Sequence, residues 1–419
     1  MKLSKHKLGE LIEVTRGASL SGQFYAEEGE FVRLTLGNFN MNGGGFKENT
    51  SKTDLYYTGT VKDEFILNKD DIITPLTEQS LGLLGTTARI PESGKYIQSQ
   101  DVALVKCKKG LLDPNFCYYL ISSSVVRQQL SAGAQQTKIR HTSPDKIKDC
   151  TVWIPELEVQ KRIGRILSDI DEKIALNRQI NDNLEAMAKQ LYDYWFVQFD
   201  FPNEEGKPYR TSNGAMVWNE KLKREIPQGW DNGVLADVAN ITMGQSPDGS
   251  SYNENGEGVI FYQGSTDFGL RFPKIRQYTT APSRYANKGD ILMSVRAPVG
   301  ALNIANNNCC IGRGLSALSS KIGSMTHLYY LMNDFRLKFE RMNSAGTTFG
   351  SITKDELLNL PVVIPIKSII SGFEKVCDPI FDKQMVIGEE INALTRLRDE
   401  LLPLLMNGQA SVNYHLSAY

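Results

Sequence analysis

The side chains best suited to hydrolytic chemistry in this sequence are a few carboxylates and one lysine. Asp145 follows a proline, and Asp171, Glu172 and Lys173 are consecutive. Paired carboxylates and a lysine can hold Mg²⁺ and activate a water molecule, as a nuclease requires. Asp171 to Lys173, however, interrupt apolar residues that recur at helical spacing, and charged residues of such a helix normally face solvent. We therefore expect a solvated helix face here, not a nuclease site.

Metal and thiol chemistry has little support. The six cysteines form no C-x-x-C pair and have no metal-type spacing with the four histidines. We expect buried free thiols in a reducing cytoplasm, and no metal site.

Cofactor motifs are also absent from the sequence. There is no G-x-x-x-x-G-K-[ST] loop for ATP, no G-x-S-x-G and no H-E-x-x-H. The nearest fragments to the Asn/Asp-Pro-Pro-aromatic motif of amino-methylating enzymes begin at Asp113 and Asp378, and both lack the second proline. We expect neither methyltransferase nor ATPase activity in this chain.

The composition predicts an ordinary globular protein of two or three domains. The chain has 419 residues, of which 41% are hydrophobic and 23% charged, with a net charge of −1. No window approaches 18 consecutive apolar residues, and the N-terminus lacks an apolar signal core, so we expect a cytoplasmic protein without a membrane span. Near-neutral charge normally argues against nucleic acid, so any DNA contact would need local basic patches or partner proteins.

The element most able to organise the chain is a long helix predicted over Ile163–Trp195. Its apolar residues alternate steps of four and three, with two asparagines filling the gaps, and this heptad pattern needs a partner helix. A buried asparagine in such a seam typically fixes register. The seam comprises Ile163, Leu167, Ile170, Ile174, Asn177, Asn181, Leu184, Ala188, Leu191 and Trp195.

A second, looser seam follows 210 residues later and provides the partner. It comprises Phe373, Cys377, Ile380, Gln384, Ile387, Ile391, Leu394, Arg398, Leu401 and Leu405. Preceding segments repeat in the same order at offsets that drift from 227 to 210, as in two diverged copies. The matching pairs include Leu8–Gly17 with Leu235–Gly244, Tyr118–Leu120 with Tyr329–Leu331, and Trp153–Pro155 with Val363–Pro365.

Each copy is interpreted as a mixed α/β unit followed by its long helix. Short apolar runs cut by Gly, Asn and Pro predict strands, and helices are predicted over Pro114–Arg127 and Thr326–Phe339. The resulting division is a first domain over 1–155, a helix over 156–198, a connector over 199–228, a second domain over 229–365, a helix over 366–408 and a tail over 409–419.

Several marks in and around the first helix are typical of one known family. They include Trp153–Pro155, Gln160, Ile170–Ile174, Leu191–Phe196 and Phe199–Pro202, and in the second copy Ile226–Trp230 and Gly289–Leu292. The chain resembles the DNA-specificity subunits of type I restriction–modification systems over essentially its whole length. The second helix departs from the pattern, because Ile370 replaces Gln160 and Pro379 replaces Asp169. A helical proline costs roughly 3 kcal/mol, so we expect this helix to start late or kink.

The resemblance implies an α/β fold with two target-recognition domains separated by two long antiparallel helices, related by a pseudo-twofold repeat. It implies a noncatalytic reader of double-stranded DNA. Two modification subunits would bind it, bring S-adenosylmethionine and methylate adenines. Restriction subunits, using ATP and Mg²⁺, would complete the complex.

The helix length suggests how such a protein would measure DNA. A helix over 156–195 would be about 60 Å long, and base pairs rise by about 3.4 Å. We therefore expect a bipartite target, with two half-sites around a nonspecific gap and the helices as the spacer.

Base reading requires Arg, Lys, Asn or Gln on loops that enter the major groove. Some of the candidates would instead contact phosphate, which positions the protein without reading sequence. The candidates are Gln79, Ser80, Gln135, Gln136, Lys138 and Arg140 in the first domain, and Arg271, Lys274, Arg276, Arg296 and Arg313 in the second.

Two other interpretations stay open at this point. The chain could be a stand-alone DNA-modifying enzyme or nuclease with an unrecognised site, although the missing cofactor motifs oppose this. It could also be a scaffold whose α/β units bind protein instead of DNA.

Overall fold

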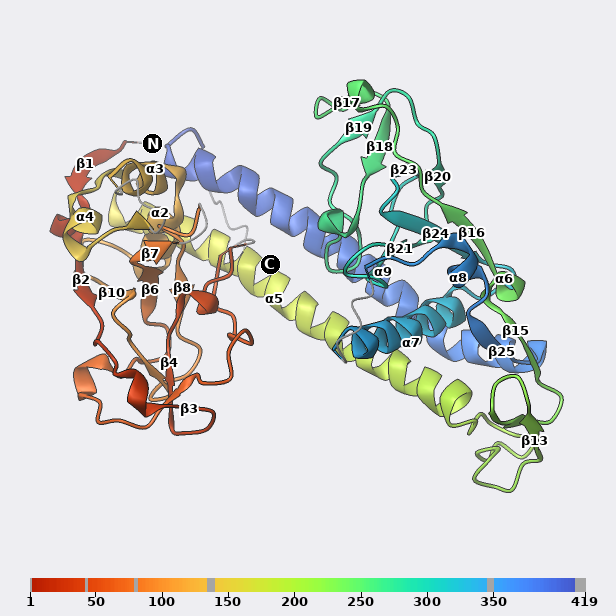
Figure 1. Ribbon diagram of the computed structural model, residues 1–419. Coiled ribbons are helices and arrows are strands. Elements are labelled where there is room, and N and C mark those ends of the chain that lie inside the picture. The colour runs from red at the N-terminus through yellow and green to blue at the C-terminus, as the bar shows by residue number, and fades with distance from the viewer. Residues whose placement is uncertain (1, 42–43, 79–81, 134–139, 345–349, 411–419) are drawn as a thin grey trace, which may run out of the picture. The chain divides into compact units, whose positions relative to one another are not determined.

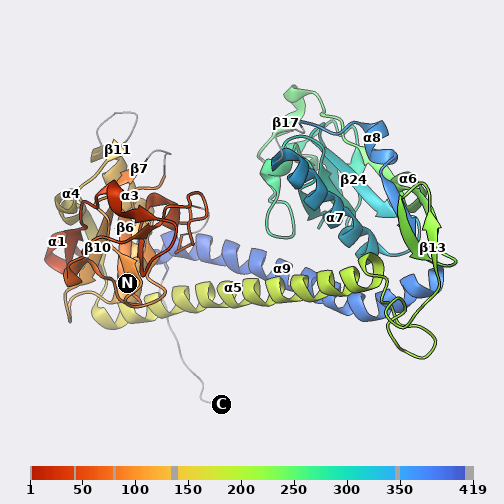
Figure 2. The ribbon, with the colours of Figure 1, turned by 60° about the horizontal axis from the view of Figure 1, so that its bottom comes forward.

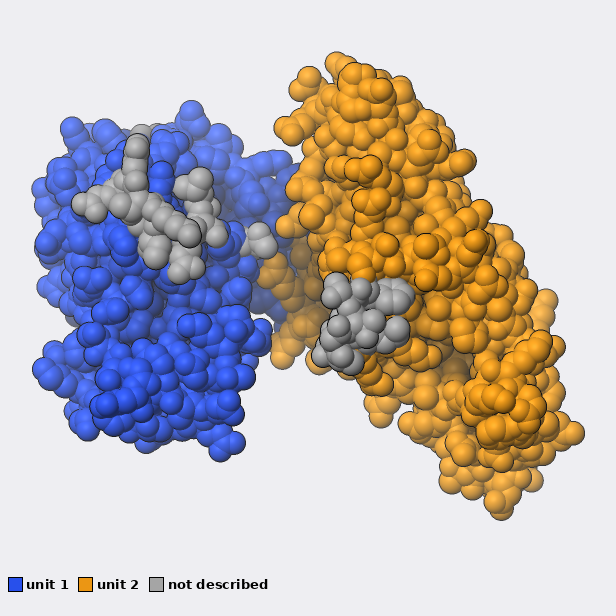
Figure 3. Space-filling model, in the orientation of Figure 1, with its two compact units in different colours: residues 1–176, 392–419 blue, residues 177–391 orange. Residues whose placement is uncertain are grey.

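The computed structural model describes residues 2–41, 44–78, 82–133, 140–344 and 350–410 (Figure 1). The chain divides into two compact units (Figure 3). The first contains residues 1–176 together with 392–419, and the second contains residues 177–391. The first unit is therefore assembled from two separate chain segments.

The described residues of the first unit form two small β-sheets and two strand pairs. The central sheet is antiparallel, in the order β2 (Ile12–Arg16), β10 (Val102–Cys107), β6 (Ile72–Pro75) and β8 (Ala88–Arg89). The second sheet has the order β3 (Tyr25–Ala26), β5 (Tyr56–Tyr57), β4 (Phe31–Arg33) and β9 (Tyr96–Ile97), with β4 and β9 parallel. The pairs are β1 (Ser4–Lys7) with β12 (Thr151–Ile154), and β7 (Thr77–Glu78) with β11 (Arg140–His141).

Four short helices accompany these sheets among the described residues of the first unit. They are α1 (Leu8–Leu11), α2 (Pro114–Ser122), α3 (Ser124–Gly133) and α4 (Pro144–Asp149). The start of α2 is fixed by Asp113, whose carboxylate accepts a hydrogen bond from the Phe116 amide at 3.0 Å. The single helix predicted over Pro114–Arg127 is wrong, because extended backbone at Ser123 separates α2 from α3.

The second unit repeats the same plan. Its central antiparallel sheet has the order β16 (Ala239–Met243), β24 (Leu315–Ser320), β21 (Ile291–Ser294) and β22 (Leu302–Ile304). Its other sheet has the order β17 (Tyr252–Asn253), β19 (Tyr278–Thr279), β18 (Val259–Tyr262), β23 (Cys309–Ile311) and β20 (Tyr285–Ala286), with β18 and β23 parallel. The strand pair is β15 (Asp231–Val234) with β25 (Pro361–Ile364), and the helices are α6 (Leu235–Val238), α7 (Met325–Ser344) and α8 (Lys354–Leu358). The predicted α/β fold with an internal repeat is confirmed.

Two long helices, α5 (Leu157–Tyr192) and α9 (Lys367–Met406), contribute residues to both units (Figure 2). A π-helical turn over Asp193–Val197 follows α5. Of the two consequences expected of Pro379, the late start of α9 is wrong, because the helix begins at Lys367 and includes the proline, while the kink stays a prediction. Buried Phe373 and Cys377 precede the proline, and their burial offsets the hydrogen bond that it removes.

Within the second unit the two helices run antiparallel. Asn177 donates to Glu390 at 2.9 Å, Gln384 donates to Glu185 at 2.8 Å, and the rings of Trp195 and Phe373 lie 5.7 Å apart. Partners later on α5 thus lie earlier on α9. Asn177 is buried and pairs with the opposite helix, which agrees with the expected register role.

In the first unit Asp171 joins α5 to α9, instead of facing solvent as expected. Its carboxylate accepts hydrogen bonds from the Arg398 guanidinium at 2.9 Å and from the Tyr119 hydroxyl at 2.7 Å. Burial, followed by the nearby Asp171 charge, raises the pKa of Tyr119 well above its ordinary value. Asp145 lies elsewhere on α4 and pairs with Lys148 at 2.7 Å. The structure therefore gives Asp171 a structural role.

The seam residues differ in how completely they are buried. Ile163, Leu167, Ile170, Ile174, Asn177, Asn181, Ile387 and Ile391 are buried, whereas Leu184, Leu191, Leu394 and Leu401 are half-buried. Ile163 and Leu167, which join the hydrophobic core of the first unit, are among the fully buried residues, whereas Leu184 and Leu394 belong to neither core.

The segment between the repeats is an ordered connector packed on aromatic rings. It contains the hairpin of β13 (Met216–Asn219) and β14 (Arg224–Pro227). Phe201 stacks between Tyr209 at 4.6 Å and Trp230 at 5.1 Å, measured between ring centroids. These contacts attach the connector to the second unit.

The six cysteines are free; five are buried and Cys107 is half-buried. In the part of the chain that the structure describes, no helix has the length and apolar character needed to cross a bilayer.

Replacing Asp171 by asparagine should lower the free energy of unfolding by about 1–3 kcal/mol, because Arg398 loses a charged partner in a largely buried site. Urea unfolding of the full chain measures this change. Asp169→Asn, at an exposed position two residues away, is the matched control and should change stability by less than about 0.5 kcal/mol. Equal effects of the two substitutions would contradict the assigned role of Asp171.

Candidate nucleic-acid interface

Most candidates in the first unit lie outside the described residues: Gln79, Ser80, Gln135, Gln136 and Lys138. The residues that flank these two segments are described, and two of them, Glu78 and Arg140, lie side by side. Residues 79–81 follow Glu78 at the end of β7, and residues 134–139 precede Arg140 at the start of β11. Arg140 and Glu78 are direct partners in the β7–β11 ladder. The described residue before the first segment thus lies beside the described residue after the second.

Glu78 holds the backbone at Gly82, Leu83 and Leu84 by hydrogen bonds. Its side chain is 1% exposed, and one carboxylate oxygen accepts hydrogen bonds from the amides of Gly82, Leu83 and Leu84 at 3.1, 2.9 and 3.0 Å. The other oxygen lies 3.5 Å from an Arg140 guanidinium nitrogen. Glu78 was not among the predicted residues. Its burial and its three amide partners are not visible in the sequence, so no sequence signal identifies it.

In the second unit a turn over Gln263–Asp267 lies beside two exposed arginines. The Asp267 side chain is buried and accepts the Gln263 amide at 2.8 Å. Its other oxygen pairs with Arg276, whose Nε lies at 2.8 Å. Lys274 is exposed on the same loop, and its amide donates to the Asp267 carbonyl at 2.7 Å. The turn and this cationic loop thus form one surface.

Arg313 lies on the other side of that turn, between two glycines. The Gly312 amide donates to the Tyr262 carbonyl at 2.8 Å, and a Cβ on Gly314 would lie 2.6 Å from the Gln263 carbonyl oxygen. Only glycine allows this close approach. Arg313 itself is exposed, so Lys274, Arg276 and Arg313 surround one turn with positive charge.

In the second unit, Arg296 lies at the position that corresponds to the β7–β11 ladder of the first unit. It is exposed just after β21 and forms an isolated antiparallel bridge with Ser351. By the repeat, this bridge corresponds to the Thr77–His141 pair of the β7–β11 ladder. Both units therefore carry candidate residues at the same ladder.

Arg271 does not belong with the exposed candidates. It is 4% exposed, donates to Glu185 at 3.0 Å and to Gln384 at 2.7 Å, and lies 4.9 Å over the Tyr329 ring. The structure thus places the Arg271 guanidinium inside the protein, unlike the exposed candidates of the same unit, and its contacts give it a structural role.

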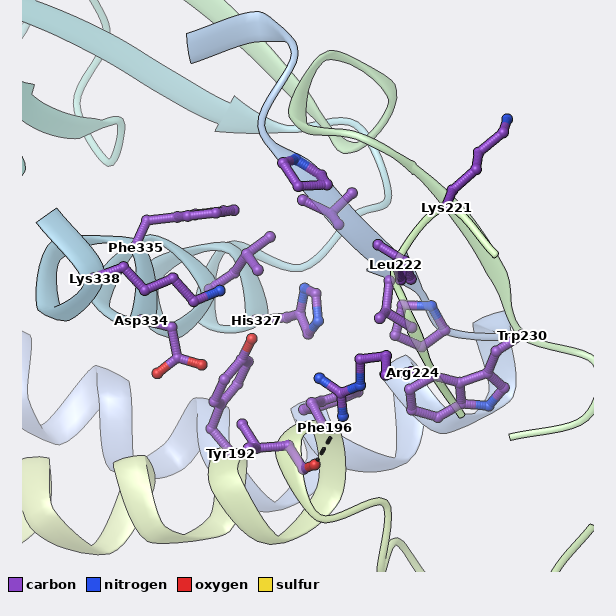
Figure 4. A pocket seen from close by; sticks show the side chains of 16 residues that line it. Tyr192, Phe196, Lys221, Leu222, Arg224, Trp230, His327, Asp334, Phe335 and Lys338 are labelled. Carbon is purple, nitrogen blue, oxygen red and sulfur yellow. Dashed lines mark hydrogen bonds between the residues drawn. The ribbon is translucent and has the colours of Figure 1, made fainter. Parts of the chain in front are cut away.

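A cavity of about 310 Å³ in the second unit is lined in part by His327, whose pKa is lowered (Figure 4). The His327 ring lies 4.6 Å from Phe196 and 5.7 Å from Tyr192, and its Nδ1 has no hydrogen-bond partner. Burial lowers the pKa of His327 to about 4. The nearby Asp334 carboxylate lies 3.1 Å from the Lys189 ammonium. His327 is thus a neutral ring in an aromatic wall.

The lowered pKa of His327 predicts a pH dependence of stability. The unfolded chain binds this proton with a pKa of about 6.5, so its contribution is complete above that pH and falls as the pH drops toward 4. The loss should reach roughly 3 kcal/mol. His327→Phe, measured by urea unfolding between pH 4 and 7, should remove that part of the slope. His6→Gln, which changes a partly exposed histidine, should leave it. An unchanged slope in His327→Phe would contradict the assignment.

Comparison with known proteins gives a consistent result. A family model described as the type I restriction modification DNA specificity domain matches residues 2–186 and 227–401. The MjaX specificity subunit of a type I restriction enzyme, from Methanocaldococcus jannaschii, is 30% identical over 379 residues, covering 86% of this chain and 84% of the relative. The MjaIX specificity subunit of the same organism is 26% identical over 323 residues, covering 73% and 71%.

One solved structure supports the fold. The S subunit of a type I restriction–modification system from M. genitalium aligns with a TM-score of 0.60 at 17% identity, covering 97% of this chain and 96% of that one. At this identity the likeness concerns the fold alone.

Proposed function

The chain belongs to the family of type I restriction–modification DNA specificity proteins, and we propose that its two α/β units read two separated half-sites of one DNA duplex. It is a recognition subunit and not an enzyme in its own right. One observation supports the bipartite target: the chain contains two copies of the same four-stranded central sheet, β2-β10-β6-β8 and β16-β24-β21-β22. Two readers in one chain need two binding sites on DNA.

The long helices are proposed as the spacer between the half-sites. The 36 residues of α5 extend over about 54 Å, which corresponds to about 16 base pairs at 3.4 Å each. Residues of α5 and of α9 belong to both units, so a change in helix length acts on both readers. Half-sites related by the pseudo-twofold repeat would lie on opposite strands.

Among the candidates, the exposed cations around the Gln263–Asp267 turn have the best support for DNA contact. Lys274 and Arg313 are exposed and could reach phosphates or base edges, and Arg276 is exposed beside its buried partner Asp267. In the first unit we propose Gln79, Ser80, Gln135, Gln136, Lys138 and Arg140, because the described residues beside these segments, Glu78 and Arg140, are partners in the β7–β11 ladder. Arg296 is proposed at the corresponding ladder of the second unit.

The proposed domain limits follow the strand pairs. The first reader extends over 1–155 and the second over 229–365, since β12 ends at Ile154 and β25 ends at Ile364. We propose helical segments over 156–198 and 366–408, which contain α5 and α9, a connector over 199–228 and a tail over 409–419.

The chain works as part of a larger restriction–modification assembly. We propose that two modification subunits bind it and bring S-adenosylmethionine for adenine methylation. Restriction subunits that use ATP and Mg²⁺ would join them, in the cytoplasm. A stand-alone enzyme is not proposed, because the family match and the named relatives are specificity subunits.

Methylome sequencing tests the bipartite target. A host that carries this chain with a type I modification subunit should acquire one methylated motif composed of two short specified segments around a fixed unspecified gap. The same host with the modification subunit alone should lack it. A continuous motif, or methylation independent of this chain, would contradict the proposal.

Lengthening both helices tests the spacer. One heptad inserted after Leu176 in α5 and one after Ile391 in α9 adds about 10.5 Å, so the accepted gap should grow by about three base pairs while both half-sites stay the same. The methylated motif gives the result directly. An insertion in α5 alone is the control, and it should abolish methylation because it shifts the pairing with α9. An unchanged gap in the double insertion would disprove the spacer role.

A further inference from the structure

Arg271 is buried in the second unit although it belongs to a loop with exposed cations. The loop connects the 3₁₀ turn over Ser265–Asp267 with β19, and it carries Lys274 and Arg276 at its surface. Arg271 points the other way, into the protein, and is 4% exposed. Burial of a charged group is costly unless partners compensate it, so these partners define what the residue does.

The partners of Arg271 come from both long helices and from α7. One guanidinium nitrogen donates to Glu185 of α5 at 3.0 Å and to the Tyr329 hydroxyl of α7 at 3.3 Å. The other terminal nitrogen donates to Gln384 of α9 at 2.7 Å, and Gln384 in turn donates to Glu185 at 2.8 Å. We call Arg271, Glu185 and Gln384 the Arg271 network. Together with Tyr329, it links one loop to α5, α7 and α9.

The shape of the site is specific for arginine. The guanidinium carbon lies 4.9 Å from the Tyr329 ring and 4.8 Å from the Phe381 ring, at distances typical of cation–π contacts. A planar group with several donors can contact both rings and also bridge Glu185 and Gln384. Lysine has the charge but neither the plane nor the fork, so it would not reproduce the network.

The side chains of the loop also fit closely against the helix. A Cβ on Gly388 of α9 would lie 2.8 Å from Phe272 and 3.3 Å from the Arg271 Cβ, so only glycine leaves room for the loop here. The Arg271 carbonyl accepts the Ile304 amide at 3.0 Å, and Asn303 bonds to both backbone groups of Gly269 at 3.1 Å. The loop is thus held between β22 and the helix pair.

From this geometry we infer that Arg271 is a positioning residue for recognition of the second half-site. It makes no DNA contact itself. It fixes the loop whose Lys274 and Arg276 lie three and five residues further along, a reach of at most about 10 to 18 Å. Because the fixed points are on α5 and α9, the network aligns the reading loop with the spacer. This inference rests on the proposed function.

In the first unit a different arginine bridges the two long helices, so the role inferred for Arg271 is specific to the second reader. There Arg398 of α9 pairs with Asp171 of α5, so the cation comes from the helix pair itself. The corresponding loop contributes Gly44 and Gly45 instead, and a Cβ on either would lie 3.8 Å from the Tyr118 hydroxyl. Removing Arg271 should therefore affect one half-site and spare the other.

The test measures discrimination at each half-site separately, in the complex with modification subunits. A photo-crosslinking amino acid at exposed Thr266 identifies the half-site read by the second unit. Binding is then measured on the methylome-defined duplex and on duplexes with one base changed in either half-site. Arg271→Ala should reduce discrimination at the half-site that crosslinks by about tenfold or more, and change it at the other by less than about twofold. Arg271→Lys should show the same reduced discrimination at that half-site, because lysine cannot replace the guanidinium contacts.

Two further variants distinguish positioning from general destabilisation. Glu185→Gln keeps the side-chain shape and should reduce discrimination at the same half-site by a smaller factor. Arg336→Ala, on α7 in the same unit with its own partner Glu340, should change neither half-site. Equal losses at both half-sites, or no loss in Arg271→Ala, would overturn the inference. If the unmodified complex showed no bipartite motif, the proposed function would fail instead, whatever Arg271 does.

Discussion

The structure depends on the antiparallel pairing of α5 with α9. Neither helix can leave its apolar stripe in water, and each α/β unit covers only part of it. The buried ends of the stripe, such as Ile163 and Leu167, join a core that also contains Leu405 and Met406 from the far end of the chain. In the second unit, Ala188 joins Phe373 and Cys377 in the same way. Each unit therefore encloses one portion of the helix pair.

Polar residues inside this seam add direction to the hydrophobic attraction. An apolar stripe alone permits several registers, because leucine and isoleucine contacts are nearly interchangeable. Asn177 with Glu390, and Glu185 with Gln384, form hydrogen bonds in one register only. Asp171 with Arg398 has the same effect in the first unit. These pairs favour specificity of pairing over maximal stability.

Sequence patterns predicted the parts of the structure that repeat and missed those that depend on individual partners. The duplicated segments and heptad spacing identified both long helices and the matched α/β units, because periodicity reports which face of an element is buried. The same patterns placed Asp171 on a solvated face and Arg271 at the DNA surface. A side chain's partner lies far away in sequence, so local spacing does not reveal that Asp171 meets Arg398 or that Arg271 turns inward. The late start expected from Pro379 was wrong for a similar reason, because tertiary packing outweighs the local cost of proline in a helix.

For the candidate interface, residue types in the sequence indicated candidate loops but not Glu78. The role of Glu78 depends on three amides and one arginine that contact its carboxylate.

The composition of the first unit from two distant segments has a consequence for biosynthesis. Residues 1–176 leave the ribosome first, but the core that they form includes Leu405 and Met406. The unit synthesised first is therefore the last to be completed, after the whole second unit has emerged. A premature stop codon within the last turns of α9 would leave the second unit with all of its residues. It would remove core residues from the first unit, most of which is encoded far upstream.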